Sequence, residues 1–153
     1  MTDSQYIKNI FDWLETGGIK YENTPAQKIL GLRILKEEYD ELVEGLITEN
    51  REEILDGAVD EIWMISNCLV FNGISYDEFM EYFQKVAMSN WSKFCATQEI
   101  AEETVKAYAE GTHFDKPGIK IECYWEQVGN VYVIKRNDGK ILKSIFYTDV
   151  KNV

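Results

Sequence analysis

The segment from Leu32 to Leu42, LRILKEEYDEL, is the most informative part of the sequence. On a helical projection of about 100° per residue, the apolar residues here form one stripe. The stripe comprises Leu32, Leu35, Tyr39, Leu42, Val43 and Leu46. Glu38 lies about 40° from Leu42, beside the stripe, and Glu41 is its neighbour one turn later. Two like charges in this position are destabilising unless a cation lies between them. The other acids, Glu37, Asp40 and Glu44, fall on the opposite side and are predicted to face solvent.

A second line of acids follows in the segment 55–71, which is apolar on nearly every side. A helix of this kind is normally buried. Asp56, Asp60 and Asn67 nevertheless lie near one line of this helix, and Glu53, just before the segment, lies close to that line. Buried acids need paired bases or a metal. No Lys or Arg occurs between Glu52 and Gln84, so Mg²⁺ bound by hard carboxylate oxygens is the simplest counter-ion. The alternative is that Glu38 pairs with a Lys or Arg across the bundle and that Asp56 caps a turn.

Start and stop signals predict further helices around these two. The predicted helices are 3–16, ending at a Gly-Gly pair; 25–47, opened by Thr24-Pro25; 51–71; 75–93, opened by a capping box; and, more weakly, 98–110. After residue 112 the helical spacing of apolar residues ends. Strand-like segments rich in Val, Ile, Tyr and Phe then cover 120–127, 131–136 and 141–147. Gly129-Asn130 and the segment 137–140 are hairpin signals. We therefore expect a mainly α fold: a four- to five-helix bundle over residues 1–112, with an antiparallel β-hairpin or three-stranded meander over residues 113–153.

Charge and cysteine usage exclude several classes of protein. The chain has 27 Asp and Glu against 16 Lys and Arg, a formal net charge of −11. This charge repels phosphate backbones, so nucleic acid is not an expected partner. Three dispersed cysteines and the lone His113 offer no zinc ligand set. Free thiols, the absence of a signal peptide and the lack of an apolar stretch of about 20 residues predict a cytoplasmic protein with no membrane partner.

The same residues resemble a known family. The E-x-x-E pattern at Glu38 and Glu41 is similar to that of the all-α nucleotide pyrophosphohydrolases, which include MazG, dimeric dUTPases and phosphoribosyl-ATP pyrophosphohydrolase. In that family a later E-x-x-D helix completes a four-carboxylate magnesium site. The sequence is particularly similar to a phage-type branch, which writes the second motif as D-G-x-x-D, here 56–60. It also resembles that branch at 89–94, SNWSKF, and at 138–143, DGKILK. The likeness covers residues 20–147 and implies a MazG-like bundle.

The second motif departs from the wider family at one position. The family places a Glu three residues before its Asp, whereas this chain has Gly57 there. Asp56 can substitute from one residue earlier, because i and i+4 share a helix face. The other register takes 53–56, EILD, as the literal E-x-x-D. We favour Asp60 as the family Asp, with Asp56 as the fourth carboxylate and Glu53 as its alternate.

The resemblance implies a reaction and a set of roles. Water attacks the α-phosphorus of a nucleoside triphosphate, a dNTP or a non-standard NTP, and gives the monophosphate and pyrophosphate. Mg²⁺, with Mn²⁺ as a substitute, is held by Glu38, Glu41, Asp56 and Asp60. Glu38 or Glu41 acts as general base, Lys93 binds phosphate as a point charge, and Asn90 orients Lys93 or contacts the sugar. The family builds its sites between subunits, so a homodimer or homotetramer is expected.

Two other readings of the sequence stay open. The chain can have phosphoribosyl-ATP pyrophosphohydrolase activity on the same fold. It can also be a non-enzymatic acidic interaction protein, such as a DNA mimic or a helical adaptor, which the charge of residues 1–112 would suit. Without the resemblance, Lys93 is a solvated lysine at a helix end. Trp63 and Trp91 are either core residues or surfaces on which a base stacks.

Overall fold

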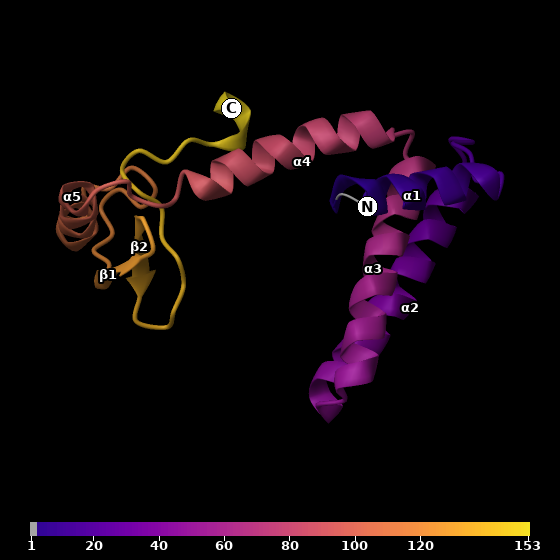
Figure 1. The fold of residues 1–153 in the computed structure, drawn as a ribbon, viewed down its shortest axis with the longest axis horizontal. Helices are drawn as coiled ribbons and strands as arrows, with labels where there is room; N and C mark the ends of the chain where they lie inside the picture. The colour runs from indigo at the N-terminus through magenta and orange to yellow at the C-terminus, as the bar shows by residue number, and fades with distance from the viewer. Residues whose placement is uncertain (1–2) are drawn as a thin grey trace. The chain divides into compact units, whose positions relative to one another are not determined.

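Five helices dominate the computed structural model, which describes residues 3–153 (Figure 1). In chain order they are α1 (Asp3–Thr16), α2 (Pro25–Thr48), α3 (Arg51–Phe71), α4 (Tyr76–Trp91) and α5 (Gln98–Glu110). Two strands, β1 (Cys123–Val128) and β2 (Val131–Arg136), and a 3₁₀ helix, η1 (Val150–Asn152), complete the fold. The mainly α class with a small antiparallel sheet is thus confirmed. None of the helices within residues 3–153 has the length and apolarity that crossing a membrane requires.

The chain divides into two compact units, Met1–Met80 and Glu81–Val153, and the division falls within α4. In the first unit, α2 and α3 form an antiparallel hairpin (Figure 1). The predicted start of α2 is confirmed: Pro25 is its first residue, and the Thr24 hydroxyl accepts a hydrogen bond from the Gln27 amide at 3.2 Å. Glu49, in the left-handed region at φ 55°, ends α2, and Asn50 caps the start of α3 through the Glu52 amide.

Glycines allow α2 and α3 to approach each other closely. A Cβ at Gly57 would lie 2.9 Å from the Leu42 Cα, and a Cβ at Gly45 would lie 2.9 Å from the Ile54 amide nitrogen. Both contacts are with backbone atoms, which cannot move aside as a flexible side chain can. The turns of α2 and α3 that bear carboxylates therefore lie at the closest part of the hairpin.

The apolar stripe predicted to be core is only partly buried in the single chain, because Leu35, Leu42 and Val43 are half-buried whereas its other three residues are exposed. Leu32 is 66% exposed and Tyr39 56%, and Ile62 on α3 is 45% exposed. We call this surface the apolar α2–α3 face and define it as Leu32, Tyr39, Leu46, Leu55, Val59, Ile62 and Ile65. The expected burial of α3 on nearly every side is likewise not observed. The physical reason is that a helix hairpin with α1 on α3 has too few neighbours to cover every apolar side.

The second unit contains the β-hairpin. β1 and β2 pair in antiparallel register from Cys123 opposite Arg136 to Val128 opposite Val131, and Gly129-Asn130 forms the two-residue turn. Of the two arrangements expected, the hairpin is present rather than the meander. The segment predicted as a third strand bonds to β2 only through the Leu142 amide and an isolated Lys135–Ile141 bridge. We call residues 140–149 the strap.

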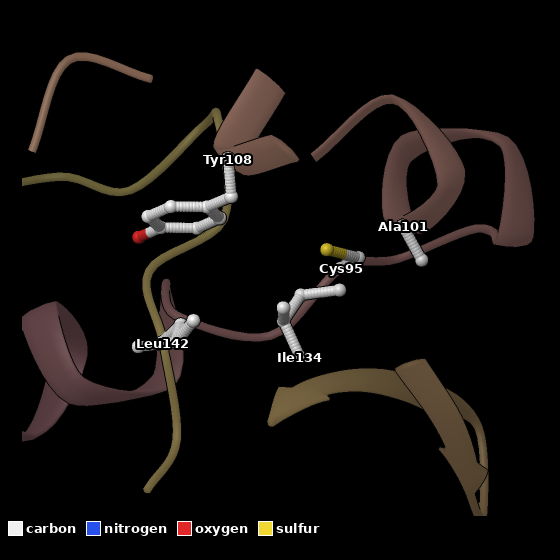
Figure 2. Packing of buried hydrophobic residues seen from close by; sticks show 5 residues of the cluster. All are labelled: Cys95, Ala101, Tyr108, Ile134 and Leu142. Atoms are coloured by element: carbon white, nitrogen blue, oxygen red, sulfur yellow. The ribbon is translucent and has the colours of Figure 1, made fainter. Parts of the chain in front are cut away.

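The core of the second unit joins α5 to the hairpin and the strap. Figure 2 shows Cys95, Ala101, Tyr108, Ile134 and Leu142 converging from these segments, and each is at most 7% exposed. The change of period at residues 112–113, where the sequence suggests a domain boundary, lies inside this unit because α5 and the hairpin share one core.

Candidate functional site

Four carboxylates from α2 and α3 line one cavity in the first unit. The lining residues are Glu41 and Glu44 from α2, and Glu53, Asp56 and Gly57 from α3, around a volume of about 320 Å³. Each helix contributes two acids three residues apart, which places them one turn apart on one side of the helix. Glu44, predicted to face solvent only, is exposed and also lines this cavity. We call this group the carboxylate cavity.

Glu38 is half-buried and electrostatically coupled to both helices. Burial is the largest effect that raises the pKa of Glu38, and the negative charges of Asp60 and Glu41 raise it further. Asp56 also raises it, more weakly. Desolvation and like charges both disfavour the ionised form. The other three predicted carboxylates are therefore close enough to Glu38 to influence its ionisation.

The alternative roles weighed for these acids are not seen in the structure. Within residues 3–153, the ion pairs involve neither Glu38, Asp56 nor Asp60. The acids on the other side of α2 do pair locally, Glu37 with Arg33 and Asp40 with Lys36. Asp56 lies inside α3, so it caps no turn.

The close approach of the two helices explains the departure of the second motif from the family pattern. Gly57 is buried, and any side chain there would meet the Leu42 backbone. A Glu at this position would require the helices to separate. Asp56 and Glu53 both line the carboxylate cavity, and of these two only Asp56 is among the charges that raise the pKa of Glu38. The choice between the two registers stays a prediction that favours Asp56.

The donor chemistry of this group fits a hard divalent cation. Carboxylate oxygens are the ligands that Mg²⁺ prefers. After burial, the like charges of Asp60, Glu41 and Asp56 raise the pKa of Glu38, and a bound cation would neutralise this part of the effect. In the described part of the chain, no three His, Cys, Asp or Glu side chains already converge in a ligating arrangement.

The predicted phosphate-contacting residues meet in a turn of the second unit. Lys93 follows the end of α4, and its ammonium donates a hydrogen bond to the Asn90 side-chain oxygen at 2.6 Å. The Lys93 carbonyl accepts from the Ser144 amide at 3.1 Å, and Cys95 exchanges backbone hydrogen bonds with Tyr132 on β2. The segments 89–94 and 138–143, noted separately in the sequence, are thus held together through the strap.

The aromatic residues have ordinary packing partners. Trp63 packs edge-on against Trp13, with ring centroids 5.3 Å apart, and Trp91 packs edge-on against Phe94 at 5.4 Å. Trp91 is nevertheless 68% exposed, so one face remains open. Asn67, noted only for its place on the acidic line of α3, has a buried side-chain oxygen without a hydrogen-bond partner within the described residues. A buried polar atom of this kind cannot be recognised from sequence alone.

Known proteins give no independent guide to this site. Comparison of the chain with protein-family models, with curated proteins and with solved structures finds no match. Function is therefore proposed from the chain's own residues, their contacts and the motif resemblance described above.

Proposed function

We propose that the chain is a Mg²⁺-dependent nucleoside triphosphate pyrophosphohydrolase, which converts a dNTP or a non-standard NTP to the monophosphate and pyrophosphate. The observation that supports this most is the carboxylate group of the first unit. Glu41 and Asp56 line one cavity. Burial and then the charges of Asp60, Glu41 and Asp56 raise the pKa of Glu38, and within residues 3–153 none of these four acids pairs with a Lys or Arg. A cluster of acids without counter-charge is suited to a substrate that brings metal-bound phosphates.

Each carboxylate has a proposed role. Glu41, Asp56 and Asp60 hold the metal, and Glu38 shares in this. When bound, Mg²⁺ would polarise the phosphoryl oxygens and lower the pKa of a coordinated water. Glu38, half-buried on α2 one turn before Glu41, is the proposed general base and accepts a proton from the water that attacks the α-phosphorus. The bond from the α-phosphorus to the bridging oxygen breaks, and pyrophosphate leaves with that oxygen.

Lys93 and Asn90 are the proposed phosphate contacts of the second unit. A lysine ammonium is a compact point charge with several donors, and Asn90 already orients it through one hydrogen bond. A bound phosphate would take one of the remaining donors.

We further propose that a second copy of the chain covers the apolar α2–α3 face, in a homodimer or homotetramer. The large apolar residues of this face are each at least 43% exposed, and Leu32, Tyr39 and Ile65 line one hollow between α2 and α3. Exposed apolar surface on neighbouring helices supports an interaction site. Burial against the same helices of a second copy would cover both chains at once, as in a two-fold interface.

The decisive experiment is a product assay on a panel of dNTPs, NTPs and phosphoribosyl-ATP, with Mg²⁺ and with excess chelator. Release of pyrophosphate with Mg²⁺ only, from at least one triphosphate, supports the proposal, whereas release of orthophosphate contradicts it. Preference for phosphoribosyl-ATP would select that alternative activity. Light scattering across a concentration series tests the assembly, and a monomer at all concentrations contradicts it.

One observation favours a second candidate function. Residues 1–80 carry 17 acidic and 6 basic residues, so 6 − 17 gives −11, the whole net charge of the chain. A helical adaptor for a basic partner would use such a surface. Complete absence of pyrophosphate release across the panel would favour this candidate.

A further inference from the structure

A buried hydroxyl, that of Ser89, lies directly before the proposed phosphate-binding turn. We propose that Ser89 is a positioning residue: through Tyr147 and Thr148 of the strap, it fixes the turn that carries Asn90 and Lys93. The inference rests on the proposed function insofar as Lys93 contacts phosphate. It also gives the C-terminal strap a role.

Ser89 is 2% exposed and lies in the last turn of α4. Its hydroxyl oxygen is 2.9 Å from the Tyr147 phenol oxygen and 2.9 Å from the Thr148 carbonyl oxygen. The Thr148 carbonyl can only accept, so the single Ser89 proton goes to it. The Tyr147 phenol then donates to the Ser89 oxygen, so each of the two hydroxyl groups donates one hydrogen bond. Ser89 is thus bonded to two consecutive strap residues.

Further contacts extend this attachment to the turn itself. The Ser92 hydroxyl donates to the Ser89 carbonyl at 2.7 Å and accepts from the Thr148 amide at 2.9 Å. On the other side of the turn, the Ser144 amide donates to the Lys93 carbonyl at 3.1 Å. The backbone from Ser89 to Lys93 is therefore attached to the strap at both ends.

These contacts act on Lys93 without involving its charge. The Lys93 ammonium bonds only to Asn90 in the described residues, so its direction follows from the backbone of the turn. The ring of Tyr147 is itself anchored, because it stacks near Phe114 and lies 4.4 Å below the Lys143 ammonium. Removal of the Tyr147 hydroxyl alone would leave those ring contacts in place. It would remove one of the hydrogen bonds that attach the turn to the strap.

The test combines kinetics with a measurement on the free protein. Steady-state hydrolysis of the best triphosphate is measured for wild type, Ser89→Ala, Tyr147→Phe and the same changes in a Lys93→Ala background. We expect each single change to lower kcat/KM by about tenfold, and to have little further effect once Lys93 is absent. Mg²⁺ affinity of the free protein should stay unchanged. Ser66→Ala is the matched control, since Ser66 is also 2% exposed and its hydroxyl also donates to a backbone carbonyl.

Amide hydrogen exchange of residues 90–94, without substrate, is the second measurement. We expect Ser89→Ala and Tyr147→Phe to accelerate exchange there, and Ser66→Ala to leave it unchanged. Equal losses with and without Lys93 would show a general structural role and overturn the inference. Unchanged exchange would overturn it as well. If wild type releases no pyrophosphate, the proposed function fails, and the exchange measurement alone still decides whether Ser89 positions the turn.

Discussion

Gly57 on α3 lies against Leu42 on α2 so closely that a Cβ would come within 2.9 Å of the Leu42 Cα. This contact sets the separation of the two helices that bear the predicted metal ligands. It also means that a Glu at position 57 could not be accommodated without moving α2 away from α3.

Substitution of Gly57 should therefore destabilise the helix pair. We expect Gly57→Ala to lower the free energy of unfolding by about 1–3 kcal/mol, the usual cost of overpacking a tight contact. Urea denaturation measures this. Gly17→Ala serves as the control because its Cβ would meet no atom nearer than 3.4 Å, and it should change stability by less than about 0.5 kcal/mol. Equal effects of the two substitutions would contradict the close contact.

Neutral replacement of the central carboxylates should abolish turnover and preserve the fold. Glu41→Gln and Asp60→Asn are nearly isosteric, so each removes a charge with little change in packing. We expect kcat to fall by more than about 100-fold, whereas the melting temperature without metal stays the same or rises, because repulsion is relieved. Asp40→Asn, in an exposed pair with Lys36, is the control. Activity of the two site variants at the wild-type level would rule out the assigned site.

The two registers of the second motif predict opposite orders of Mg²⁺ affinity. If Asp56 is the fourth ligand, Asp56→Asn should weaken binding by about tenfold or more, the scale of perturbing a metal site. Glu53→Gln should then have a much smaller effect. Isothermal titration with Mg²⁺ compares them directly. The reverse order would establish EILD, residues 53–56, as the functional motif.

Loss of the Lys93 charge should affect substrate and spare the metal. Lys93→Ala should lower kcat/KM, and the loss should correspond to about 1–3 kcal/mol of transition-state stabilisation, the range for a hydrogen bond to a charged group. Lys93→Arg should recover only part of this, since a planar guanidinium replaces a point charge. Lys85→Ala makes the same change of charge at a residue paired with Glu81. Equal losses at Lys85 and Lys93 would mean general electrostatic attraction rather than a specific contact.

Acidification should destabilise the second unit through His113. Burial is the largest influence and lowers the pKa of His113 below its ordinary 6.5, although the Asp115 charge opposes it. The native state then binds the proton more weakly than the unfolded chain. The neutral form of buried His113 contributes fully to stability above about pH 6.5, and this contribution is lost progressively below that value. His113 is the only histidine, so His113→Gln should flatten the dependence of unfolding free energy on pH between about 7 and 5.5. An unchanged slope in this variant would contradict the assignment.

Local signals in the sequence predicted most of the elements, because their causes lie within a few residues. The Thr24-Pro25 start of α2 and the Gly129-Asn130 turn are examples. Relationships between distant segments could not be predicted in this way. Amphipathic spacing identified Leu32 and Tyr39 as apolar but could not reveal what covers them. Glu44 joins the carboxylate cavity because of where α3 lies, and a helical projection of α2 alone does not contain that information.

The attachment of Lys93 to the strap is also a long-range effect. Ser144 lies far from Lys93 in the chain, and the Ser89–Thr148 contact joins segments that no local pattern relates. Resemblance to the phage-type branch placed only the segments 89–94 and 138–143 in order along the chain, and Ser144 and Thr148 lie outside both. The hydrogen bonds of Ser89 and Lys93 to the strap add a physical connection within one unit.

The apolar α2–α3 face has a consequence for how the protein behaves on dilution. A solitary chain keeps Leu32, Tyr39 and Ile62 in contact with water, whereas the proposed association would remove them from it. Mass action would then link the number of copies present to the fraction that is folded. Glu41 and Asp56 lie on the same two helices, so their relative placement would inherit that dependence. Protein concentration would become a variable that controls the chemistry as directly as the supply of metal or substrate.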